Sequence, residues 1–330
     1  MSDGIPSLDE IRAARDPVSV HLKRTPLHPY PGLSKLLGAE VWVKHENHLA
    51  TGAFKVRGGV HLASRLSERE RAAGLVTAST GNHGQSIAFA GKVTGTAVTV
   101  AVPEVANPEK VEAMRALGAR VVHHGADFDA AREWIAGEAA RRGARFVGPT
   151  DAELIAGVGT YALEILEDLP EVEVIFVPVG AGSGACGVCL VAKQLSPGVE
   201  VIGVQSESAP AVQRSWRSGR LEEAPMRTRA EGLATRVAHE SAMRILGHPA
   251  HGLDDFLLVS DQALERAIWL LLEHTHNMAE HAGAAALAGA LSVRERLAGR
   301  KVVLILSGGN LSTTALAEIA AKQSGVIRAR

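Results

Sequence analysis

The chain has 330 residues, of which 46% are hydrophobic, and this length allows about two domains with sizeable cores. Its 35 basic and 36 acidic side chains leave a formal net charge of −1, which argues against an extended nucleic-acid surface or a polybasic membrane anchor. Two cysteines exclude a disulfide framework and a four-thiolate zinc site. The chain does not begin with a basic and apolar leader, so we expect a soluble, cytoplasmic protein.

Short β-rich runs alternate with longer segments rich in Ala, Leu, Glu and Arg. The expected strands are residues 40–44, 97–102, 120–123, 174–178, 199–205 and 301–306. The expected helices are residues 108–118, 129–143, 160–169, 185–194 and 261–275. Apolar strands that alternate with helices of this length predict an α/β fold with a mostly parallel sheet.

The longest uncharged run, residues 174–192, is almost long enough to span a membrane. It contains Pro178 and four glycines, which a spanning helix would not easily carry, so we expect a strand, a loop and a helix. Ligands of open α/β sheets bind where loops follow the carboxyl ends of strands. Four such loops are prominent, at residues 45–59, 79–86, 180–187 and 307–310.

The loop at residues 180–184 follows an apolar strand directly and contains Gly180, Gly182 and Gly184. Glycines allow backbone N–H groups to approach an anion, and a following helix adds a favourable dipole, so a phosphate site is expected. The same stretch also matches the dinucleotide fingerprint G-x-G-x-x-[GA], with Glu207 about 22 residues after it. The loop alone therefore does not separate a nicotinamide dehydrogenase from another phosphate-binding enzyme.

Three partial metal patterns do not indicate a metal site. The stretch at residues 45–48, His-Glu-Asn-His, is one residue shorter than the zinc motif H-E-x-x-H. Cys186 and Cys189 are interpreted as small buried residues that pack on the sheet. The histidines at 274, 276 and 281 are interpreted as polar residues on a helix and at its end.

Lys55 lies between Phe54 and Val56 and is followed by two glycines, Gly58 and Gly59. Partial burial in such surroundings disfavours the ammonium form of a lysine. Neutral lysines form Schiff bases with carbonyl cofactors, and Lys55 is therefore a candidate for this chemistry.

Five motifs in the same order resemble the fold-type II pyridoxal-phosphate enzymes, in the branch of the serine/threonine dehydratases and serine racemase. They are residues 51–58 (TGAFKVRG), 79–85 (STGNHGQ), 180–184 (GAGSG), 230–234 (AEGLA) and 307–310 (SGGN). The resemblance extends over nearly the whole chain. It implies the two-domain architecture of tryptophan synthase β, with a large domain of residues 1–73 and 151–330 and a small mobile domain of residues 74–150.

The resemblance also implies a role for each motif residue. Lys55 would hold pyridoxal 5'-phosphate as a Schiff base and move the Cα proton, and Asn82 would hydrogen-bond the phenolic oxygen. Phe54 would lie near the ring, and Ser307 would face the pyridine nitrogen. The other implied cofactor contacts are Gly180, Ala181, Gly182, Ser183 and Gly184 at the phosphate, with Gly232 and Glu280. The substrate carboxylate would bind at Ser79, Thr80, Gly81, Asn82 and His83.

Some positions depart from the family pattern. Ala53 replaces a frequent Ser, and Ala181 and Ser183 interrupt a run that is often four glycines. Gln205 and Ala211 match positions that are acidic in the racemase branch, so we expect no divalent metal there. Thr80 matches the residue that is Ser in racemases, where racemisation needs a second proton donor on the opposite face of the ring.

The resemblance predicts an ammonia-lyase that converts a β-hydroxy amino acid, L-threonine or L-serine by default, into a 2-oxo acid and ammonia. The alternatives are an amino-acid racemase, a dehydratase of hydroxyaspartate or phenylserine, and a β-replacement synthase. His83 favours the dehydratase branch, because synthases usually have Thr there. A dehydrogenase and a silent cofactor-binding protein remain as remote alternatives. A homodimer without nucleic-acid or membrane partners is expected.

Overall fold

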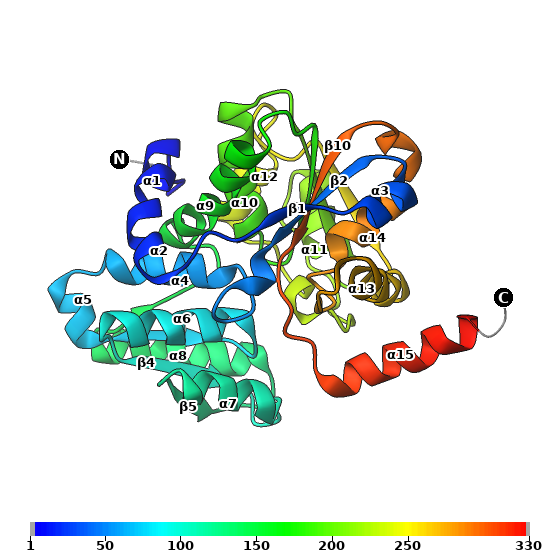
Figure 1. The fold of residues 1–330 in the computed structure, drawn as a ribbon. Coiled ribbons are helices and arrows are strands. Elements are labelled where there is room, and N and C mark those ends of the chain that lie inside the picture. Colours follow the sequence, from blue (N-terminus) through cyan, green and yellow to red (C-terminus); the bar gives the residue numbers. More distant parts are fainter. Residues whose placement is uncertain (1–3, 328–330) are drawn as a thin grey trace. The chain divides into compact units, whose positions relative to one another are not determined.

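The chain forms two compact units in a computed structural model that describes residues 4–327 (Figure 1). Unit 1 contains residues 4–23 and 49–160, and unit 2 contains residues 24–48 and 161–327. The predicted domains separate residues 1–73 from residues 74–150, whereas the division by contacts groups residues 4–23 and 49–73 with residues 74–150. That residues 74–150 move as a small domain stays a prediction.

Unit 1 is built on a four-stranded parallel sheet in the order β5-β4-β3-β6. Its strands are β3 (Leu75–Ala78), β4 (Val98–Val102), β5 (Arg120–His123) and β6 (Arg145–Phe146). Its helices are α1 (Leu8–Ala13), α2 (Arg15–His21), α4 (Lys55–Ser64), α5 (Glu68–Ala73), α6 (Asn82–Thr94), α7 (Pro108–Ala116) and α8 (Phe128–Arg142), and it contains the first part of α9 (Ala152–Asp168).

Side-chain alternation gives the sheet of unit 1 two buried faces. On β4, Val100 belongs to a core that α6 and α7 complete with Ile87 and Met114. The neighbouring Ala101 belongs to a second core, which contains Ile135 of α8. Helices therefore cover both faces, and the loops after the strands remain as the places where ligands can bind.

Unit 2 is built on a six-stranded sheet in the order β1-β2-β10-β7-β8-β9. Its strands are β1 (Leu27–Pro29), β2 (Glu40–His45), β7 (Val174–Pro178), β8 (Glu200–Ser206), β9 (Asp255–Val259) and β10 (Lys301–Leu306). Strand β1 is antiparallel to β2, and the pairings among β2, β10, β7, β8 and β9 are parallel. Figure 1 shows β2 beside β10, so segments from near both ends of the chain meet in one sheet.

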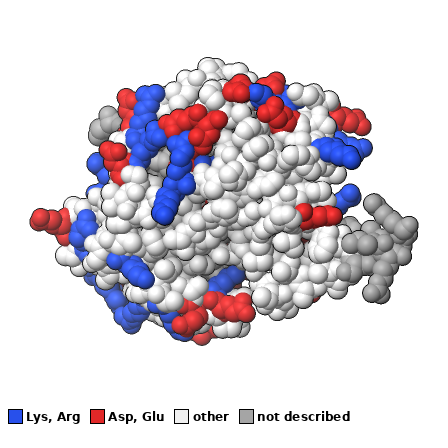
Figure 2. All heavy atoms as spheres, in the orientation of Figure 1, with Lys and Arg blue, Asp and Glu red and all other residues white. Residues whose placement is uncertain are grey.

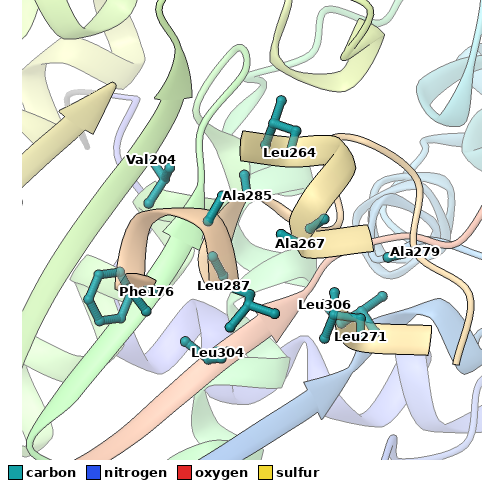
Figure 3. Packing of buried hydrophobic residues seen from close by; sticks show 14 of the residues in the cluster. Phe176, Val204, Leu264, Ala267, Leu271, Ala279, Ala285, Leu287, Leu304 and Leu306 are labelled. Carbon is teal, nitrogen blue, oxygen red and sulfur yellow. The ribbon is translucent and has the colours of Figure 1, made fainter. Parts of the chain in front are cut away.

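Helices and short 3₁₀ turns complete unit 2. They are α3 (Pro31–Leu37), η1 (Glu46–His48), α10 (Ser183–Leu195), α11 (Ala211–Ser218), η2 (Glu231–Leu233), α12 (Glu240–Leu246), α13 (Asp261–Thr275), α14 (Ala285–Ser292), η3 (Arg294–Leu297) and α15 (Thr313–Ile327). Figure 3 shows strand residues Phe176, Val204 and Leu304 in the same core as Leu264 and Leu287 of α13 and α14. Burial of a side chain such as Leu264 stabilises the fold by about 1.5–3 kcal/mol.

Most of the expected elements are confirmed. The uncharged run at residues 174–192 is a strand, a loop and a helix, and α13 spans all of the expected residues 261–275. Helix α9 begins eight residues before the expected position, at Ala152, and includes Gly157 and Gly159. A Cβ on Gly157 would lie 2.7 Å from the Cβ of His61, so this glycine permits close packing of α9 against α4 and does not end the helix.

Within residues 4–327, no helix combines the length and the apolar character needed to cross a membrane. Basic and acidic side chains lie close to one another at several places on the face drawn in Figure 2. This mixture agrees with the nearly balanced charge of the sequence.

Candidate active site

Lys55 is the first residue of α4, and Phe54 is the N-cap residue of that helix. Both residues are half-buried, and the Nζ atom of Lys55 lies 5.2 Å from the centroid of the Phe54 ring. Leu49, Val56 and Val60 share a buried cluster that anchors the start of α4 within unit 1. The lysine side chain therefore extends from a fixed helix start.

Asn82 is the first residue of α6, directly after the loop that follows β3. In this loop the Gly81 amide donates to Ser79 Oγ at 3.2 Å, and the Ser79 amide donates to the Ala101 carbonyl at 3.2 Å. No side chain caps α6, so the amides of its first turn are suitable donors for a carboxylate. The structure thus brings the five predicted substrate-binding residues, 79–83, together in one loop and helix start.

A second loop of unit 1, at residues 147–151, lies against this turn. The Val147 carbonyl accepts a hydrogen bond from Thr77 Oγ1 at 2.9 Å, and His83 Nε2 lies 3.3 Å from the same oxygen. Burial raises the pKa of Asp151 to about 6, and Arg145, with a guanidinium nitrogen 3.9 Å from the carboxylate, opposes this shift. His83 therefore connects the predicted carboxylate site to the loop that contains Asp151.

The glycine loop of unit 2 joins β7 to α10. A Cβ on Gly180 would overlap the carbonyl oxygen of Gly232, so a larger residue has no room there. Gly182 is the N-cap residue of α10 and has a φ of 107°, which strains any other residue. The hydroxyl of Tyr161 donates to the Gly184 carbonyl at 3.1 Å and holds the first turn of the helix.

These features fit a phosphate group. No side chain caps α10, and its first turn presents backbone amides and the positive end of the helix dipole to the loop. The predicted departures, Ala181 and Ser183, leave this arrangement intact because the donors belong to the backbone.

A segment at residues 228–233 supports the glycine loop and is held by buried polar groups. Gln205, which is fully buried, donates to the Leu233 carbonyl at 3.4 Å and accepts from the Gln213 amide at 3.0 Å. Asp261 accepts from the Thr228 hydroxyl at 2.6 Å, and also from the Arg229 amide and from Ser206 Oγ. Gln205 and Ser206, which belong to these two sets of hydrogen bonds, lie at the carboxyl end of β8. This end of the strand therefore fixes Gly232 against Gly180.

Ser307 directly follows β10 and is 5% exposed. The Glu280 amide donates to the Gly308 carbonyl at 3.1 Å, and a Cβ on Gly283 would overlap the same carbonyl. A Cβ on Gly232 would in turn lie 2.7 Å from the Cβ of Ala282. The structure therefore brings the glycine loop, Gly232, Glu280 and Ser307 into one contiguous group within unit 2.

The other predicted residues lie as follows. Cys186 and Cys189 are fully buried, as expected, and burial raises the pKa of both thiols. His274 lies on α13 and His276 caps its end. His281 is buried, which lowers its pKa, and its Nε2 atom has no hydrogen-bond partner among residues 4–327.

Among these described residues, no group of three or more His, Cys, Asp or Glu side chains could hold a metal ion. Gln205 and Ala211 lie at the end of β8 and the start of α11. The prediction that no divalent cation binds there stays a prediction.

Three residues that support the predicted motifs were not singled out from the sequence: Tyr161 and Asp261 in unit 2, and Ser86 in unit 1, whose hydroxyl donates to the Lys55 carbonyl. Asp261 is the first residue of a predicted helix. Acidic residues are common at helix starts because they interact favourably with the helix dipole, so the sequence does not distinguish Asp261 from them. Ser86 follows Asn82 by four residues, the spacing of one helical face, and this was the available signal.

Comparisons with known proteins agree with this geometry. The family described as pyridoxal-phosphate dependent enzyme matches residues 18–308. An L-threonine ammonia-lyase of Thermotoga maritima is 38% identical over 95% of this chain and 78% of its own length. An L-threo-3-hydroxyaspartate ammonia-lyase of Saccharomyces cerevisiae is 34% identical over 97% of this chain and 98% of its own. The structure of maize serine racemase superposes with a TM-score of 0.89 at 28% identity, covering 98% of this chain and 99% of that one.

Proposed function

The chain belongs to the pyridoxal-phosphate dependent enzymes, and we propose that it removes water and ammonia from a β-hydroxy amino acid, with L-threonine or L-serine as the first candidates. The observation that carries this proposal is the similarity to an L-threonine ammonia-lyase over 95% of the chain, with Lys55 and Asn82 each at the first position of a helix. The dehydrogenase alternative is set aside, because it leaves Lys55, Asn82 and Ser307 without a role.

The residues that would hold the cofactor are Lys55 and Asn82 of unit 1, and the glycine loop, Gly232, Glu280 and Ser307 of unit 2. When bound, pyridoxal phosphate supplies a carbonyl carbon for an amine and an electron sink for charge at the substrate Cα. Ser307 would offer a hydroxyl, and not an acid, to the pyridine nitrogen, which would make the electron sink weaker. A weaker sink suits β-elimination, in which the leaving group removes the charge.

The proton movements follow from the side chains. With the cofactor bound, the amine of Lys55 would be the base that takes the Cα proton. The Cα–H and Cβ–O bonds break and a Cα=Cβ bond forms, so the substrate loses one proton and the hydroxyl, together one water. The enamine that leaves the protein then takes up one water to give the 2-oxo acid and ammonia. The backbone amides of residues 79–83 orient the substrate by its carboxylate, which sets the Cα–H bond toward Lys55.

The choice of substrate is tested with the purified holoprotein. L-Threonine, L-serine and L-threo-3-hydroxyaspartate are supplied separately, and oxo acid and ammonia are measured. We expect the two products in equal amounts from L-threonine or L-serine. If the protein converts only L-threo-3-hydroxyaspartate, its substrate would be the one named for the yeast relative and not L-threonine or L-serine. Absence of oxo acid from all three would contradict the proposal.

A racemase is the second candidate, because the fold is shared with maize serine racemase and Thr80 offers a hydroxyl in the loop that would bind substrate. Incubation of L-serine in heavy water, followed by chiral chromatography, separates the two activities. D-Serine that carries deuterium at Cα, formed faster than oxo acid, would favour the racemase.

We also propose a cytoplasmic homodimer, as the family resemblance implies. Light scattering coupled to size-exclusion chromatography measures the mass in solution. A mass of about one 34.6 kDa chain would contradict the dimer.

A further inference from the structure

Helices α4 and α6, which begin with Lys55 and Asn82, pack so closely that their backbones nearly touch. A Cβ on Gly59 of α4 would overlap the hydroxyl of Ser86 on α6 and would lie 2.7 Å from the Ser86 carbonyl oxygen. Ser86 is fully buried at this crossing. Its position therefore depends directly on α4, without any intervening side chain.

Ser86 forms a hydrogen bond that joins the two helices. Its hydroxyl donates to the carbonyl oxygen of Lys55 at 2.6 Å. Other hydroxyls on these helices bond within their own helix: Ser64 donates to the His61 carbonyl at 2.7 Å, and Thr94 donates to the Ala90 carbonyl at 2.8 Å. The Ser86 bond thus connects α6 to the backbone of the residue that would carry the cofactor.

We propose that Ser86 is a positioning residue that fixes the backbone of Lys55 relative to Asn82. This inference rests on the proposed function, because it concerns Lys55 as the lysine that holds the cofactor. Asn82 lies one helical turn before Ser86, so a displacement of α4 against α6 moves the lysine amine relative to the asparagine amide. A misplacement of about 1 Å in a reacting group can lower the rate by about a hundredfold.

The test removes the hydroxyl and keeps the rest of the crossing. Ser86→Ala leaves the Cβ in place and adds no atom near Gly59. We expect kcat to fall by about tenfold with KM within about threefold of wild type, because part of the positioning remains in the packing of the helices. The cofactor-free protein should also react more slowly with added pyridoxal phosphate, by a similar factor, as followed by the visible absorption band.

Two variants serve as controls. Ser64→Ala removes a hydroxyl-to-carbonyl bond of the same kind at the other end of α4, and we expect both rates to stay within about twofold of wild type. Ser86→Cys keeps a side chain of similar size with a weaker donor. If the hydrogen bond positions Lys55, Ser86→Cys should show the same loss of kcat and of the rate of cofactor reaction as Ser86→Ala. A variant close to wild type would mean that volume alone matters.

Several outcomes would overturn the inference. Unchanged kcat and unchanged cofactor reaction in Ser86→Ala, with only a lower melting temperature, would leave a purely structural role. If Ser86→Ala does not fold, Ser86→Cys supplies the same comparison. A wild-type protein that forms no absorption band with pyridoxal phosphate would contradict the proposed function. A normal wild-type band that both Ser86 variants form at the wild-type rate, with wild-type kcat, would contradict only the role of Ser86.

Discussion

The predicted site residues are held in different ways in the two units. In unit 1 the groups predicted to contact the cofactor are the side chains of Lys55 and Asn82, whose helices pack directly at Gly59 and Ser86. In unit 2 the groups predicted to bind its phosphate are backbone amides, and buried polar side chains such as Gln205 and Asp261 hold the segment that packs against the glycine loop.

The two kinds of support tolerate substitutions at different positions. A backbone amide stays in place when its own side chain changes, so Ala181 and Ser183 are compatible with a phosphate loop. A position at which two backbones touch has no such freedom, as at Gly180 and Gly232. In unit 1 the proposed chemistry depends on the side chain of Lys55 itself, so replacement of Lys55 should remove it.

Lys55→Ala should therefore reduce activity more than any other substitution considered below. Turnover should fall by more than about a thousandfold, because the nucleophile and the base for the Cα proton are lost together. The melting temperature should stay within a few degrees of wild type, since Lys55 is half-buried at a helix start. Lys92→Ala, an exposed position on α6, is the matched control with expected wild-type activity. Residual turnover above a hundredth of wild type would show that another group does this chemistry.

Gly180→Ala tests the backbone contact in unit 2. The new Cβ would overlap the Gly232 carbonyl, and overpacking of this kind costs about 1–3 kcal/mol. We expect the dissociation constant for pyridoxal phosphate to rise by about ten- to a hundredfold, measured by titration of the cofactor-free protein. Gly198→Ala is the control, because nothing lies within 4 Å of a Cβ at that position. Equal affinity in both variants would mean that the glycine loop does not hold the phosphate.

Gln205→Leu tests the buried hydrogen bonds that support the contact between Gly180 and Gly232. The Leu233 carbonyl and the Gln213 amide would lose a buried partner, and an unsatisfied buried group costs about 1–3 kcal/mol. Cofactor affinity should fall by about tenfold, while kcat at saturating cofactor stays near wild type. Gln194→Leu removes an exposed glutamine bond on α10 and should change neither value. If the affinity of Gln205→Leu matches that control, the segment at 228–233 is not needed for the cofactor.

Asp151→Asn has the smallest expected effect and concerns unit 1. Burial raises the pKa of Asp151 to about 6 in the folded state, so the folded state binds its proton more tightly than the unfolded state. The folded state is therefore more stable with Asp151 protonated than with Asp151 ionised, and this part of the free energy of unfolding is lost as the pH rises through about 6. The neutral variant should melt a few degrees higher than wild type at pH 8 and at the same temperature near pH 4. A difference that does not change with pH would contradict this explanation.

The fold class and the site-bearing loops could be predicted from the sequence because they depend on local signals. Hydrophobic runs and helix patterns located β4, β5, β7, β8 and β10, and the glycine loop follows β7 as expected. The start of α9 could not be predicted from Gly157 and Gly159, because their function is packing against residues distant in the sequence.

The supporting residues of the site depend on such distant contacts. Gln205 bonds to Leu233, and Asp261 bonds to Thr228, across 28 and 33 positions of the chain. A buried glutamine in a strand and an acid at a helix start are ordinary features of a sequence. Only the fold shows that both hold Gly232 against Gly180.

Lys55 is proposed to hold the cofactor, and chemical reduction of the holoprotein can locate the lysine that does so. The holoprotein is reduced with borohydride, digested and analysed by mass spectrometry to locate the lysine that carries a pyridoxyl phosphate group. We predict that the group lies on Lys55, and that Lys55→Ala acquires none at any lysine. A pyridoxyl group on another lysine of the wild-type protein, or on none, would contradict the claim.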